Sequence, residues 1–142
     1  MIWNANSNSN SNSNRGGGMA YFDPEKMAVY RLARRHTRAV HTLIAGADTR
    51  GFADLVNQLR RAAASVTANV LEAGGEWRPR RQAHYFMIAK GSIWECWAHI
   101  DTFVDFELLE REAIHEARDL QNQITALLIT SIRNLDPPST QT

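Results

Sequence analysis

The sequence contains one cysteine, only 4 prolines and no long apolar run. Because Cys96 is the single cysteine, the chain cannot form an internal disulfide, and its apolar sequence surroundings are typical of a small buried thiol. No stretch of about 18 apolar residues is present, and the N-terminus lacks a basic segment followed by an apolar one. We therefore expect neither a membrane span nor secretion, and these absences favour a cytoplasmic location.

Alternation of apolar and polar residues, the mark of a half-buried strand, is also missing between residues 24 and 135. Apolar residues instead recur every three or four positions in four successive segments, which begin at Pro24, at Phe52, at Pro79 and after a turn near residues 106–110. Short connections between such segments favour antiparallel neighbours. The sequence therefore predicts an all-α fold, an up-down four-helix bundle over residues 23–136.

The two ends of the chain have a different composition. Residues 1–22 contain a Ser/Asn repeat closed by three glycines, and residues 137–142 are short and polar. Such segments cannot bury enough apolar surface to offset the entropy of ordering them, so we predict two disordered tails. The part between them, in a chain of 142 residues with 44% hydrophobic residues, is large enough for one domain with a core.

Lysine is scarce, since 14 of the 16 basic residues are arginine. The planar guanidinium suits phosphates, although an arginine bias of the genome explains the same excess. Residues 24–90 carry 12 basic against 5 acidic residues, whereas residues 91–142 carry 3 against 9. The first part is thus the candidate for contact with a polyanion. The candidate nucleic-acid-binding residues are Arg31, Arg34, Arg35, Arg38, Arg60, Arg61, Trp77, Arg78, Arg80 and Arg81.

Three of these arginines surround Pro79, where the third helix is predicted to begin. Positive charge there opposes the helix dipole, so a compensating anion is expected. RNA phosphates are one source, with binding that weakens as salt rises, and Trp77 offers a ring on which a base can stack. The alternatives are acidic residues of a neighbouring subunit or of a partner protein, and plain solvation.

A second set of polar residues has helical spacing. Ser65, Asn69 and Glu72 share one side of the second helix, and the third helix offers Lys90, Ser92 and Glu95 around Gly91. We predict that these six form an interhelical hydrogen-bond network, in preference to a binding or catalytic site. The missing Cβ of Gly91 is expected to let a neighbouring backbone approach closely.

The passages QLRRAAASVTANVLEAGG (residues 58–75) and HYFMIAKGSIWECWAHID (residues 84–101) make a family recognisable. They resemble four-helix-bundle proteins first noticed as reading frames inside intervening sequences of 23S ribosomal RNA genes. The resemblance covers most of residues 25–135, and the departures are two Val for Ile, Ala73 before the glycine and Lys90 for Arg. It implies a homo-oligomer, in known cases a ring of five bundles. It also implies kinship with accessory proteins of diversity-generating retroelements, which bind a reverse transcriptase and have a basic surface.

An enzyme is the weaker interpretation. Arg31 and His36 have the spacing of the Arg/His pair of small helical ribonucleases, and Arg78 with His84 is similar, but 14 arginines and 5 histidines produce such spacings by chance. No metal-ligand spacing, Gly-rich phosphate loop or serine elbow is present. We predict a non-catalytic protein without metal, cofactor or small-molecule substrate. Its expected partners are copies of itself and either RNA or a nucleic-acid enzyme such as a reverse transcriptase; a module that docks an acidic protein is the alternative, and a small ribonuclease is the third hypothesis.

Overall fold

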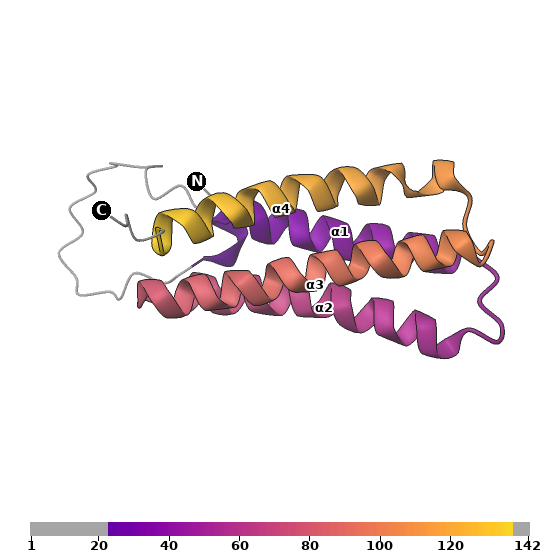
Figure 1. Cartoon of the computed structure of the whole chain (residues 1–142), viewed down its shortest axis with the longest axis horizontal. Helices are drawn as coiled ribbons and strands as arrows, with labels where there is room; N and C mark the ends of the chain where they lie inside the picture. Colours follow the sequence, from indigo (N-terminus) through magenta and orange to yellow (C-terminus); the bar gives the residue numbers. More distant parts are fainter. Residues whose placement is uncertain (1–22, 138–142) are drawn as a thin grey trace, which may run out of the picture.

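The computed structural model describes residues 23–137, and the elements within them are all helices. The four long helices are α1 (Ala28–Ala45), α2 (Ala53–Gly75), α3 (Pro79–Asp105) and α4 (His115–Leu135), with the short 3-10 helices η1 (Pro24–Lys26) and η2 (Arg111–Ile114) before α1 and α4. Figure 1 shows the four long helices side by side along one axis. The predicted all-α class and the four helices are confirmed, while the two expected tails lie outside the described residues apart from Pro137.

Each long helix packs against two others. The α1 helix contacts α2 and α4, and α3 also contacts α2 and α4, so α1 and α3 occupy diagonal corners of the bundle. Both α1 and α3 begin at the same end of the molecule, and α2 and α4 begin at the other (Figure 1). The connection between α2 and α3 therefore lies at the end where α1 begins, and the connection between α3 and α4 lies at the opposite end.

The first helix starts later than the sequence suggested. The Asp23 carboxylate accepts a hydrogen bond from the Glu25 amide at 3.1 Å, as expected of an Asp-Pro start. This cap, however, begins only the 3-10 turn η1, and Met27 then has an extended backbone with φ −82° and ψ 117°. Met27 is fully buried, so its side chain enters the core at the break and α1 begins at Ala28.

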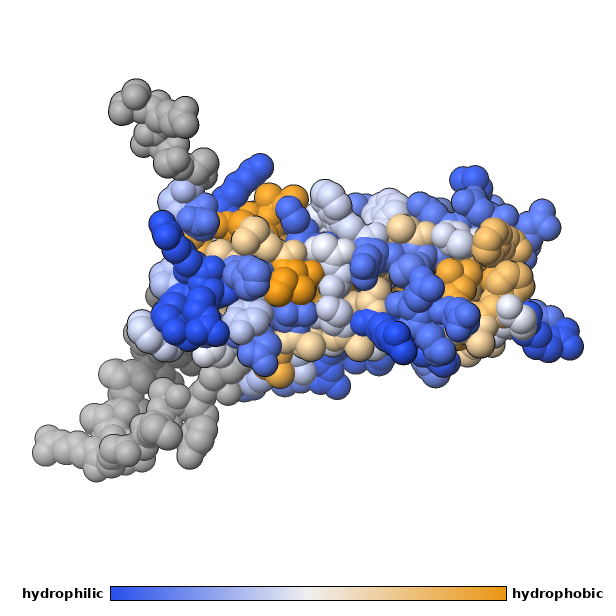
Figure 2. All heavy atoms as spheres, turned by 60° about the horizontal axis from the view of Figure 1, so that its bottom comes forward, coloured by the Kyte–Doolittle hydropathy of each residue, from blue (hydrophilic) through white to orange (hydrophobic). Residues whose placement is uncertain are grey.

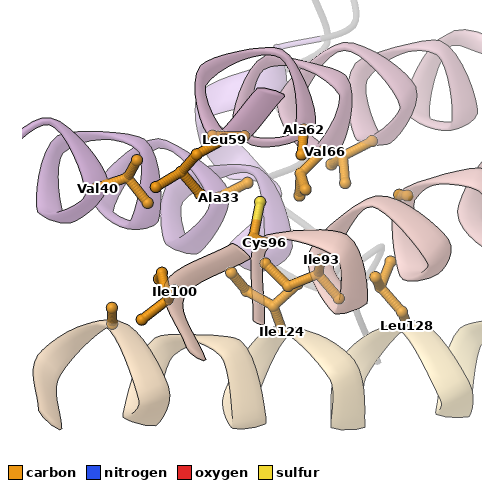
Figure 3. Close-up of a cluster of buried hydrophobic side chains, with 14 of the residues drawn as sticks. Ala33, Val40, Leu59, Ala62, Val66, Ile93, Cys96, Ile100, Ile124 and Leu128 are labelled. Atoms are coloured by element: carbon orange, nitrogen blue, oxygen red, sulfur yellow. The ribbon is translucent and has the colours of Figure 1, made fainter. Parts of the chain in front are cut away.

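The core is formed by the inward stripes of all four helices. Figure 3 shows Cys96 of α3 among Ala33, Leu59, Ala62 and Ile93, in a cluster to which α4 also contributes. Burial, the dominant cause, raises the pKa of the Cys96 thiol to about 12, so it behaves as a small apolar group. None of the helices in residues 23–137 combines the length and apolar character that crossing a membrane requires.

One polar contact crosses this core. Nε2 of Gln121 on α4 lies 3.0 Å from Nε2 of His36 on α1, and both side chains are buried. The Gln121 oxygen accepts a hydrogen bond from Arg118, so the amide nitrogen is the donor toward His36 and the imidazole proton resides on Nδ1. Nδ1 has no hydrogen-bond partner within the described structure. Burial lowers the pKa of His36 to about 4, which keeps the ring neutral near pH 7.

Candidate nucleic-acid interface

Four arginines form a stripe along the outer side of α1. Arg31, Arg34, Arg35 and Arg38 are all exposed and are spaced by three or four residues, so they share one helix face. We call this set the α1 arginine stripe. Its first two members are anchored: Arg34 pairs with the Glu25 carboxylate at 2.5 Å, and Arg31 donates to the Glu25 carbonyl oxygen at 2.7 Å.

The other two members of the stripe have no such partner. Within the described part of the chain, neither Arg35 nor Arg38 forms a salt bridge or a side-chain hydrogen bond. The buried face of α1, which carries Val29, Ala33 and Val40, points the opposite way into the bundle. The helix thus presents unpaired guanidinium groups to solvent from a rigid support.

A second basic feature is the tryptophan turn, residues 76–81, between α2 and α3. The Glu76 carboxylate accepts hydrogen bonds from the amide, Nε and Nη2 of Arg78 at 3.0, 2.8 and 3.2 Å. Oε2 of the Glu76 carboxylate also lies 3.5 Å from Nε of Arg81. On the α2 side, the Gln82 side-chain amide donates to the Ala73 carbonyl oxygen at 2.9 Å, which also accepts a hydrogen bond from the Glu76 amide at the helix end.

Glu76 is therefore the anion that the start of α3 requires. Its hydrogen bonds from Arg78, and the charges of Arg78 and Arg81, lower the pKa of the Glu76 carboxyl to about 2. The sequence analysis missed this role, although the signal was present: an acidic residue two positions before the helix cap. Arg78 and Arg81 are thereby partly neutralised, whereas Arg80 is exposed and forms no salt bridge among the described residues.

Trp77 projects from this turn into solvent. Its exposed fraction is 83%, compared with 55% for Trp94, the next most exposed large apolar side chain. The Arg78 guanidinium lies over the Trp77 ring, 5.5 Å from the ring centroid. Trp77 is thus held by ordered neighbours on both sides in the sequence while its own ring stays free.

Arg60 and Arg61 lie elsewhere, about 22 Å along α2 from the tryptophan turn. Arg61 borders an open hollow of about 450 Å³ between α2 and α3, together with Ser65, Glu95 and His99. Arg60 comes one residue before Arg61 and points about 100° away around the helix. The ten candidates consequently divide among the α1 arginine stripe, the tryptophan turn and mid-α2, and do not share a single face.

The polar residues of α2 and α3 meet in part. The Ser65 and Ser92 hydroxyls lie 2.7 Å apart, and the Asn69 amide donates to the Ser65 hydroxyl and carbonyl oxygens at 3.1 and 2.9 Å. No hydrogen bond within the described structure extends this group to the three charged residues, which are Glu72, Lys90 and Glu95. Lys90 instead lies over the Trp94 ring at 5.4 Å. A Cβ on Gly91 would meet nothing within 4 Å, so the expected close backbone approach is wrong.

The residues of the ribonuclease hypothesis do not come together. His36 is completely buried and contacts Gln121, whereas Arg31 is exposed on the other side of α1. Arg78 is held by Glu76, and His84 lies exposed further along α3. Within residues 23–137, no three His, Cys, Asp or Glu side chains are grouped so that they could hold a metal ion.

The charge imbalance of the sequence becomes an imbalance between the two ends of the bundle. Residues 23–38 carry 5 basic against 2 acidic residues, and they lie at the end where α1 begins, together with the tryptophan turn. At the opposite end, residues 105–119 carry 6 acidic against 2 basic residues. Figure 2 shows strongly hydrophilic side chains gathered at the first of these ends. We call the end where α1 begins the basic end.

Comparison with protein families gives a match over most of the chain. The model described as 23S rRNA-intervening sequence protein matches residues 25–130, which include all four helices except the last residues of α4. A comparison with curated proteins finds no match.

Proposed function

The chain belongs to the 23S rRNA-intervening sequence protein family, and from this premise we propose that it is a non-catalytic, homo-oligomeric protein that binds RNA through its basic end. The observation that carries the proposal is the α1 arginine stripe, in which Arg35 and Arg38 are exposed and pair with no acidic residue of the described range 23–137. Guanidinium groups bind phosphate oxygens through paired hydrogen bonds, so a row of them favours a nucleic-acid backbone.

Binding of this kind is independent of base sequence. Arginines on the outside of one helix reach phosphates, and contacts to phosphates position a nucleic acid without reading it. The acidic end, residues 105–119, repels the same ligand, so RNA is expected to approach from the basic end. The logarithm of the binding constant should fall linearly with the logarithm of the salt concentration, because the bound phosphates release their counterions.

The test is a titration of labelled structured RNA with the purified protein at low and moderate salt, followed by a denaturing gel of the same RNA. We expect tight binding at low salt that weakens steeply as salt rises, and RNA that stays intact. Cleaved RNA would contradict the non-catalytic part of the proposal. Absence of binding at low salt would contradict RNA as the partner.

Self-association is the second part of the proposal. The α3 helix leaves Met87, Ile88 and Trp94 exposed to 44, 39 and 55%, more apolar surface than a solvated helix needs. Figure 2 shows apolar side chains on the side of the bundle formed by α2 and α3. We propose that copies of the chain cover this surface, in a ring of five as the family resemblance implies. Light scattering should give a multiple of 16.0 kDa, and a monomer at every concentration would contradict the proposal.

An accessory role beside a nucleic-acid enzyme such as a reverse transcriptase fits the same surface, because such an enzyme works on RNA that the basic end can hold. Docking of an acidic protein by the α1 arginine stripe is the second candidate, and the unpaired Arg35 and Arg38 favour it equally. A competition experiment separates RNA binding from protein docking. If the α1 arginine stripe binds RNA, excess RNA should displace an acidic protein from it. If the stripe docks only an acidic protein, that protein should stay bound in excess RNA.

A further inference from the structure

Trp77 has an environment that RNA backbone binding alone does not explain. The proposed function needs guanidinium groups, whereas an indole ring exposed to 83% leaves a large apolar surface in water. Hydration of that apolar surface is unfavourable. The described part of the bundle leaves the ring uncovered, while its neighbours Glu76 and Arg78 bind one another.

The turn also fixes the backbone on both sides of Trp77. Glu76 accepts hydrogen bonds from the Arg78 amide and guanidinium, and the Arg78 carbonyl oxygen accepts one from the Gln82 backbone amide at 2.9 Å, so the residue after Trp77 is tied into α3. The residue before it is tied to α2, since the Glu76 amide donates to the Ala73 carbonyl oxygen at 3.2 Å. Little backbone entropy is therefore left for a ligand to remove at this point, which favours binding.

One side of the indole faces a cation. The Arg78 guanidinium lies 5.5 Å from the ring centroid, and its two hydrogen bonds to Glu76 hold it there. Because the side chain is 83% exposed, the rest of the ring remains accessible. Arg80, next but one after Arg78, carries an exposed charge that can receive a phosphate.

We propose that the tryptophan turn binds an unpaired RNA base on the free face of Trp77, with the neighbouring phosphate on Arg80. A base inside a duplex has both faces covered by its neighbours, so the ring can stack on a base in a loop, bulge or single strand, or on an open helix end. The inference rests on the proposed RNA-binding function and adds the ligand class. The α1 arginine stripe at the same end holds backbone of either form, and the turn selects unpaired nucleotides.

The experiment compares two RNAs with the same number of phosphates, a hairpin with an unpaired loop and a duplex, with the open helix ends of both closed by non-nucleotide linkers. Their affinities are measured by fluorescence anisotropy for the wild type, Trp77→Ala, Trp77→Phe and Phe106→Ala. Phe106 is the control, because it is an aromatic side chain exposed to 54% that follows α3 at the opposite end of the bundle. A 2-aminopurine base in the hairpin loop reports stacking directly through quenching of its fluorescence.

We expect Trp77→Ala to bind the hairpin about tenfold more weakly, which corresponds to about 1.4 kcal/mol, and to bind the duplex as the wild type does. Trp77→Phe should retain most of the affinity, Phe106→Ala should change the affinity for neither RNA, and quenching should disappear only in Trp77→Ala. Equal losses on both RNAs, an unchanged hairpin affinity or an equal effect of Phe106→Ala would overturn the inference and leave RNA binding standing. If the wild type binds neither RNA, the proposed function fails together with the inference, and Trp77 is then a contact for a protein.

Discussion

The hydroxyl oxygens of Ser65 on α2 and Ser92 on α3 lie 2.7 Å apart, so one hydrogen bond joins the two passages from which the family is recognisable. Ser92 is buried and Ser65 half-buried, and Asn69 adds a hydrogen bond to Ser65 from the next turn of α2. This small group fixes the register between the two helices that carry the Arg61 hollow and the tryptophan turn.

We predict that Ser65→Ala and Ser92→Ala each lower the free energy of unfolding by about 1 kcal/mol, and that the double variant loses less than the sum. Each single substitution removes the same hydrogen bond between Ser65 and Ser92, so the second substitution cannot remove it again. Urea denaturation measures all three values. Thr67→Ala is the control, because its hydroxyl donates to Ala64 within α2 and should not couple to Ser92. Strict additivity of Ser65 and Ser92 would show that the two hydroxyls do not stabilise the fold through each other.

Acid should destabilise the protein through His36. The buried imidazole has a pKa of about 4, against 6.5 for the ordinary side chain. Between these two pH values the imidazole is protonated in the unfolded chain and neutral in the folded chain. The free energy of unfolding therefore falls as pH drops from 6.5 toward 4. The full decrease is about 3 kcal/mol. Denaturation at several pH values should show this decrease in the wild type and in His84→Gln, because His84 is exposed. The decrease should be much smaller in His36→Leu. Equal pH dependence in all three would contradict the assignment.

Gly91 offers a stabilising substitution. It lies inside α3, is exposed, and has no atom within 4 Å of the position that a Cβ would take. Gly91→Ala should therefore raise the free energy of unfolding by about 1 kcal/mol, because glycine loses more backbone freedom on folding than alanine. Gly51→Ala is the opposite case, since φ of +85° makes any side chain strained there, and it should destabilise. A loss of stability in Gly91→Ala would indicate that another chain packs against this position.

The helices could be predicted because their apolar residues repeat with the helical period, and Pro79 and Asp136 mark real ends. The contact between His36 and Gln121 could not, since the two residues are 85 positions apart and only the packing of α1 on α4 brings them together. A histidine among apolar residues gives no sign in the sequence of which polar group meets it. The break at Met27 was equally hidden, because a 3-10 turn and an α-helix begin with the same Asp-Pro signal.

The residues of the candidate site could be predicted from the sequence, but their grouping in space could not. Arginine spacing on α1 predicts one stripe, and the structure has it. Whether α1 and α3 place their arginines together depends on which helices are neighbours, and the diagonal positions of α1 and α3 separate them. The pairing of Glu76 with Arg78, in contrast, is local and could have been predicted from the two-residue spacing.

Removing the charge of Glu76 should strengthen RNA binding. Glu76→Gln releases Arg78 and Arg81, so RNA affinity at low salt should rise. The plot of the logarithm of the binding constant against the logarithm of the salt concentration should also become steeper, by roughly 0.7 for each further phosphate of a single strand that is bound. Glu72→Gln is the control, with the same change of net charge, because Glu72 pairs with no arginine in the described structure. An equal change of slope in the two variants would mean that net charge alone matters.

The same substitution should cost stability in a pH-dependent way. The folded pKa of Glu76 is about 2, below the ordinary 4.5, so its stabilising contribution is present above pH 4.5 and is lost as pH falls toward 2. Glu76→Gln should consequently melt at a lower temperature than the wild type at neutral pH. The difference should shrink on acidification, and a constant difference would contradict the role of the carboxylate as the anion at the start of α3.

The central claim, that the α1 arginine stripe holds RNA, is tested most directly by charge reversal at matched positions. The Arg35→Glu/Arg38→Glu variant reverses the two unpaired arginines of the stripe, and the Arg50→Glu/Arg111→Glu variant reverses two exposed arginines at the opposite end. Both variants have the same net charge. RNA affinity at low salt should fall by at least about tenfold in the first and by less than about twofold in the second. Equal losses in the two variants, or an unchanged affinity in the first, would contradict the account.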